Sequence, residues 1–141
     1  MFHSSKAEVK RTTSPGDWHI VRECFVRSFC DYPAYKRLIQ DDSKRETFLR
    51  AYLNANYDAL VGNDRGILLV VKVPSDDTVA EKTEKDNHTN SMKIVGGCLI
   101  LRPSLALWSE KEDEVFYKSY EKHKLAKISP KDFQRLLRLF P

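Results

Sequence analysis

The fold is constrained most by two short apolar runs, Gly66–Val73 and Lys93–Pro103, which a polar stretch separates. A continuous apolar run of this length, bounded by polar residues or proline, is typical of a strand buried on both faces of a sheet. We therefore expect the two runs to pair as antiparallel strands at the centre of a sheet. Gly96 and Gly97 interrupt the second run, which indicates a β-bulge or a close approach of another element to the backbone.

The polar stretch, residues 75–92, is rich in charged residues and has almost no large apolar side chains. Such a composition cannot bury enough apolar surface to offset the entropy lost on ordering. We therefore expect residues 75–92 to be a flexible insertion between the two strands, open to proteolysis.

Helix-start patterns stand before and after the two runs. They lie at Ser14–Asp17, Ser43–Glu46, Ser109–Glu112 and Ser129–Asp132. Each places a hydroxyl at the cap position and an acidic residue three positions later. Apolar side chains then recur at helical spacing, which predicts helices over Pro15–Phe29 and Lys44–Val61 and two more towards the C-terminus.

The order of expected elements is a weak strand at Ala7–Thr13, two helices, two strands and two helices. This order predicts one α+β domain over residues 1–141, in which about four helices cover a small mixed or antiparallel sheet. Two or three strands offer little surface to four helices. We therefore expect at least one face of the sheet to be under-filled.

Composition excludes several classes of protein. The net charge is only +4, and acidic residues are interspersed with basic ones, which argues against a nucleic-acid binder. No run reaches the roughly 20 apolar residues of a membrane span. The three cysteines and four histidines lack metal-ligand spacing, so we expect no metal site. Reduced thiols and the lack of a signal peptide predict a cytoplasmic or nuclear protein.

Several motifs, in this order, are similar to the N-terminal half of a GNAT-type N-acetyltransferase. That family opens with a short strand, a helix start with Pro and Asp, and a helix that ends in Phe, an acidic residue and Pro. A second helix follows, then a strand, then a strand with a Val-Gly-Gly pattern. The matching residues here are Val9–Thr12, Ser14–Asp17, Phe29–Pro33 and Ile94–Cys98, and the resemblance extends from about Val9 to Trp108.

The resemblance implies an acyl-CoA N-acyltransferase fold and transfer of acetyl from acetyl-CoA to an amine. In that family the loop between the first two helices lines the cleft for the acceptor. The implied substrate-binding residues are Phe29, Asp31, Tyr32, Tyr35 and Trp108. Asp31 would attract a cationic amine, with the tyrosines as walls. Two alternatives stay open: Asp31 caps a turn while the aromatic rings pack locally, and Trp108 covers the edge of the sheet. The catalytic base is not assigned.

The sequence lacks the family's Gly-rich pyrophosphate turn, Arg/Gln-x-x-Gly-x-Gly/Ala, because its last glycine is Gly97. We therefore expect an incomplete acetyltransferase domain that binds acetyl-CoA poorly and is inactive as an isolated chain. The alternative is a non-catalytic protein-interaction module that retains half of the scaffold. In either case we expect self-association or a partner chain at an exposed sheet edge and at the apolar stripe of the last helix. That stripe consists of Phe133, Leu136, Leu137 and Phe140.

Overall fold

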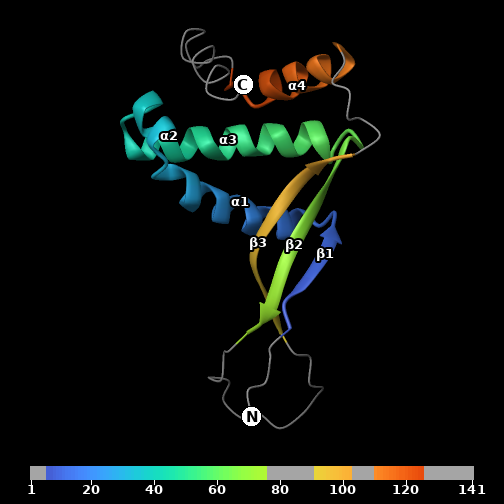
Figure 1. The fold of residues 1–141 in the computed structure, drawn as a ribbon. Helices are drawn as coiled ribbons and strands as arrows, with labels where there is room; N and C mark the ends of the chain where they lie inside the picture. Colours follow the sequence, from blue (N-terminus) through green and yellow to red (C-terminus); the bar gives the residue numbers. More distant parts are fainter. Residues whose placement is uncertain (1–5, 76–90, 103–109, 126–141) are drawn as a thin grey trace.

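The computed structural model describes residues 6–75, 91–102 and 110–125. Along the chain they form β1 (Glu8–Thr12), α1 (Pro15–Cys30), α2 (Pro33–Leu38), α3 (Asp42–Leu60), β2 (Gly66–Pro74), β3 (Met92–Leu101) and α4 (Glu110–Lys122). The predicted α+β class, with a small antiparallel sheet and four helices, is therefore confirmed. In Figure 1, α1 lies against the sheet, α3 lies beyond α1, and α4 lies beyond α3. No helix within the described ranges is long and apolar enough to cross a membrane.

The sheet has the strand order β1-β2-β3, and both pairs are antiparallel. The two apolar runs pair with each other, as predicted. The register shifts once: Val71 faces Gly96, but Lys72 faces Ile94, so Val95 is an extra residue on β3. This is the β-bulge that the glycine pair indicated.

The second glycine of the pair allows close contact between the sheet and α1. A Cβ atom added to Gly97 would lie 2.7 Å from the carbonyl oxygen of Leu69 and 2.9 Å from both γ-methyl groups of Val21, which is fully buried. A Cβ added to Gly96 would meet nothing within 4 Å. Of the two glycines, only Gly97 is therefore required by packing.

The first two long helices begin at side-chain caps. Ser14 Oγ accepts the backbone N–H of Asp17 at 3.4 Å, which confirms the predicted start of α1. The start predicted for α3 is wrong by two residues. Asp41, and not Ser43, is its cap, since Asp41 Oδ1 accepts the N–H of Lys44 at 2.8 Å. A carboxylate at this position also interacts favourably with the positive end of the helix dipole.

The core lies between one face of the sheet and the helices α1 and α3. Burying each large apolar side chain contributes roughly 1.5–3 kcal/mol. The buried apolar residues of the sheet and of these two helices are Trp18, Val21, Val26, Phe48, Leu49, Leu53, Ala55, Ala59, Leu68, Val70 and Ile94.

The prediction that both apolar runs are buried on both faces is wrong for β3. Val95 and Ile100 are 48% and 36% exposed, and Cys98, expected to be buried, is also exposed. The physical reason is that α1 and α3 contact one face of the sheet, while side chains alternate between the two faces. The under-filled sheet face that the strand count predicts is therefore present among the described residues.

Helix α4 packs on the second half of α3. The buried Ser119 Oγ donates to the carbonyl oxygen of Ala55 at 2.7 Å, and Tyr120 Oη donates to Asn56 Oδ1 at 3.3 Å. Lys124 follows the helix with a φ of 59°, a left-handed conformation that ends a helix and redirects the chain. The chain therefore turns immediately after α4.

Five expectations concern residues outside the described ranges: the centre of the polar insertion, Trp108, the cap at Ser109, the helix start at Ser129–Asp132, and the stripe from Phe133 to Phe140. The ends of the insertion are described. Pro74 pairs with Met92, and the N–H of Ser75 donates to the carbonyl oxygen of Ser91 at 2.9 Å. The hairpin ladder therefore extends into the range that the sequence assigned to a flexible insertion.

Candidate functional site

The turn between α1 and α2 brings four of the five predicted acceptor residues together. Phe29 and Tyr35 have ring centroids 6.0 Å apart, and Tyr32 and Tyr35 have centroids 6.2 Å apart. Tyr32 is 55% exposed, whereas Tyr35 is buried. Tyr32 therefore presents a ring to solvent, and Tyr35 supports that ring from the core.

Burial, together with the neighbouring Tyr52 and Tyr32, raises the pKa of Tyr35 to about 12. Its phenol consequently stays protonated at neutral pH and is unsuited to act as a general base. The contribution of Tyr35 to this site is packing.

Asp31 lies at the surface of the same turn. It is the C-cap residue of α1, and its carboxylate is 3.2 Å from Lys36 Nζ. Both side chains are at least half exposed, so this ion pair contributes little to stability. The carboxylate is accessible and can exchange Lys36 for another cation. Capping and substrate attraction, the two alternatives left open by the sequence, are therefore compatible at Asp31.

Arg45, which the sequence analysis did not single out, holds this turn in place. Its side chain is only 2% exposed although it belongs to the first turn of α3. Its Nε donates to the carbonyl oxygen of Cys30 at 2.6 Å, and its Nη1 donates to that of Ile39 at 2.7 Å. Its Nη2 forms an ion pair with Asp42. One guanidinium therefore binds the backbone on both sides of the turn between α1 and α2, which we call the acceptor turn after its predicted role.

A second polar cluster joins α3 to α4. Asp58 Oδ2 lies 2.6 Å from His123 Nε2 and 2.9 Å from Lys122 Nζ. Partial burial raises the pKa of Asp58, but the hydrogen bonds from these two residues outweigh burial and lower that pKa below its usual value. Beside this cluster is a cavity of about 350 Å³ whose lining includes Asp58, Ser119 and Lys122. Because both side chains already contact Asp58, the cluster serves to attach α4 to α3.

A third polar cluster joins α1 to α3. Glu23 accepts hydrogen bonds from Arg50 Nε at 3.1 Å and from Arg22 Nη2 at 3.0 Å. The bond from Arg50 is the main cause of the lowered pKa of Glu23. Nearby, Trp18 Nε1 donates to Asn54 Oδ1 at 3.0 Å. All of these groups are paired within the chain, so this cluster is structural.

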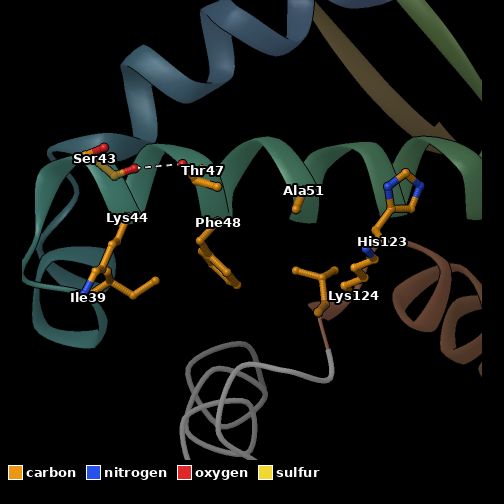
Figure 2. Close-up of a pocket in the computed structure, with 9 residues that line it drawn as sticks. Ile39, Ser43, Lys44, Thr47, Phe48, Ala51, His123 and Lys124 are labelled. Atoms are coloured by element: carbon orange, nitrogen blue, oxygen red, sulfur yellow. Dashed lines mark hydrogen bonds between the residues drawn. The ribbon is translucent and has the colours of Figure 1, made fainter.

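An apolar groove runs along the first half of α3, and it is shown in Figure 2. Its volume is about 490 Å³. Its lining comes from α3, from the residue that follows α2 and from the residues that follow α4. The lining residues are Ile39, Ser43, Lys44, Thr47, Phe48, Ala51, His123, Lys124 and Leu125. No sequence motif marked this groove, because it forms only where α3 and the end of α4 meet.

Within the described ranges, no group of three or more His, Cys, Asp or Glu side chains is placed to hold a metal ion. Cys24 and Cys30 are half-buried and Cys98 is exposed, and all three are free thiols. No protein-family model matches the chain, and neither a curated protein nor a solved structure is significantly similar to it. Any functional assignment therefore depends on the residues and geometry described above.

Proposed function

We propose that this chain belongs to the lineage of acetyl-CoA-dependent N-acetyltransferases and that its α1–α2 turn binds the acceptor amine. The observation that carries this proposal is the exposed pair Asp31 and Tyr32, on a turn that Arg45 holds rigidly between α1 and α3. The order of strand, helices and antiparallel hairpin agrees with the family resemblance, which supports the proposal.

The chemistry of the turn suits a cation. An ammonium group near Asp31 gains the attraction of a carboxylate, and the face of Tyr32 adds a cation–π contact of about 0.5–1 kcal/mol at an exposed site. Each contact is weak, so the proposal is a site of low affinity for a primary amine. The turn binds and orients; no catalytic role is assigned to it.

The proposal includes no site for the cofactor within the described residues. The sequence has no Gly-rich pyrophosphate turn, and the two cavities described above lie along α3 and α4, away from the β3 bulge. The proposal therefore assigns no contact to coenzyme A. We expect the 141-residue chain alone to bind acetyl-CoA weakly and to lack acetyltransferase activity.

A specific observation favours a second candidate, a non-catalytic protein-interaction module. The β3 strand forms one edge of the described sheet, and it exposes Val95, Cys98 and Ile100 on the uncovered face. An exposed edge with apolar neighbours is a surface on which another strand can pair. The turn and this edge are separate surfaces, so the two candidates can be tested separately.

Two titrations test the proposed function. Nuclear magnetic resonance of the chain with n-butylammonium should show shifts centred on residues 29–36 with a dissociation constant in the millimolar range. Asp31→Asn should weaken this binding at least threefold. Asp64→Asn removes another exposed carboxylate paired with a cation, Arg102, and should leave the binding unchanged.

Chemical-shift changes with n-butylammonium that are equal in Asp31→Asn and Asp64→Asn would exclude the turn as an acceptor site.

Calorimetry with acetyl-CoA is the second titration. Micromolar binding of acetyl-CoA would contradict the expectation that the chain binds this cofactor weakly.

A further inference from the structure

The groove along α3 begins beside the end of α4. α3 and α4 run antiparallel: Val115, near the start of α4, lines a cavity with Gly62, while Leu125, after its end, lines the groove with Phe48 and Ala51. Figure 1 shows α4 lying along α3 in this way. The groove therefore continues along α3 from the point where α4 ends.

The last described residues after α4 lie at one end of this groove. Lys124 has the left-handed conformation that ends the helix, and Leu125 is only 2% exposed. Leu125 is also part of the groove lining. The residues that come next, from 126 onward, are consequently tethered at one end of an apolar groove.

We propose that residues 129–140 of this chain fill the groove as an amphipathic helix. The sequence pattern places Phe133, Leu136, Leu137 and Phe140 on one face of such a helix. The apolar side chains that would receive this face are Ile39, Phe48, Ala51 and Leu125.

The dimensions agree with this assignment. At about 1.5 Å per residue, a helix over 129–140 is roughly 18 Å long, and the part of α3 from Ser43 to Ala51 is about 12 Å long. The helix can therefore cover the α3 part of the groove and reach Ile39. Since the segment begins only a few residues after Leu125, its effective concentration at the groove is in the millimolar range. This tether favours the chain's own segment over a second copy.

Electrostatic attraction does not explain why residues 129–140 would bind in the groove. The groove rim carries Lys44 and Lys124, and the segment carries Lys131, Arg135 and Arg138, with Asp132 as its acidic residue. Contact between the two must therefore be driven by apolar burial. Binding in the groove should accordingly persist at high salt.

Hydrogen exchange on the full chain tests the proposal. Amides 133–140 should be protected at least tenfold, independently of protein concentration and in 0.5 M NaCl. Thr47→Arg places a long side chain in the groove and should abolish this protection. Ser28→Arg is the matched control, because Ser28, like Thr47, is an exposed hydroxyl residue that bonds the carbonyl four positions earlier in its helix but lies outside the groove.

A second measurement covers the case in which Thr47→Arg fails to fold. With the three native cysteines changed to Ser, Thr47→Cys and Leu137→Cys should form an intramolecular disulfide, whereas Ser28→Cys and Leu137→Cys should not. Three outcomes would overturn the proposal: unprotected amides in the parent chain, protection that rises with protein concentration, which would identify a second copy as the occupant, or equal cross-linking by both pairs.

Discussion

The Gly96–Gly97 pair allows a test of the packing between α1 and the sheet with a built-in control. In Gly97→Ala the new Cβ would lie 2.7 Å from a backbone oxygen and 2.9 Å from the Val21 methyl groups. Ordinary contact begins near 3.4 Å, so the strand or the helix must move by about 0.5–0.7 Å. Overpacking of this kind costs about 1–3 kcal/mol.

The neighbouring substitution should have the opposite sign. Gly96→Ala meets no atom within 4 Å, and no glycine in the described ranges has a positive φ, so the alanine fits without strain. Restricting the unfolded chain then stabilises the protein by about 0.4–1 kcal/mol. The two adjacent variants should therefore differ by about 1.5–4 kcal/mol.

Urea denaturation followed by circular dichroism measures this difference. With a slope of about 1–3 kcal/mol/M, the two midpoints should lie at least about 0.5 M apart. Val21→Ala removes the methyl groups that Gly97→Ala meets, so the double variant should be more stable than the sum of the single changes predicts. Equal midpoints for the two glycine variants would refute the close approach of α1, and strict additivity would exclude Val21 as the residue in conflict.

The remaining predictions concern the polar clusters and the open sheet face. Arg45→Met should lower the melting temperature more than Arg50→Met and should increase amide exchange in the acceptor turn, since Arg50 is 39% exposed and binds no backbone group of that turn. Asp58 has a lowered pKa in the folded state, so its stabilising contribution is present above about pH 4 and is lost as the pH falls through the folded pKa. Unfolding of the parent chain should therefore depend more steeply on pH below about pH 4 than that of Asp58→Asn. Sedimentation should show concentration-dependent association that Val95→Lys weakens, and a stable monomer at high micromolar concentration would contradict this expectation.

Sequence reasoning found the elements that depend on local pattern. Helix α1 follows from the Ser14 cap and apolar spacing, and the β2–β3 hairpin follows from two apolar runs. Sequence reasoning failed where the exposure of a residue depends on which other elements cover the surface. An apolar run such as β3 does not reveal whether helices lie on one face or on both, so the exposure of Ile100 was unexpected.

The polar clusters had no local signature for a related reason. Asp58 and His123 are 65 positions apart, and only the packing of α4 on α3 brings them together. Arg45 reads as an ordinary surface residue of a capped helix, yet its partners are backbone carbonyl groups, which a sequence pattern does not display. The α1–α2 turn, to which the acceptor role is proposed, was singled out through its sequence motif. The part of it that is buried, Tyr35, could be assigned only with the core in view.

Helix α3 is the element on which both proposals depend. Its first turn holds the acceptor turn through Arg45, its middle lines the groove through Phe48 and Ala51, and its last turns hold α4 through Asp58. A segment that fills the groove would pack directly against Ile39, whose carbonyl oxygen is one of the Arg45 acceptors. Docking of residues 129–140 should therefore reduce motion in the acceptor turn, because both contacts restrain the same short stretch after α2. If Thr47→Arg releases the segment without changing amide exchange at residues 31–39, the groove and the turn are independent, and the C-terminal segment has no part in binding the amine.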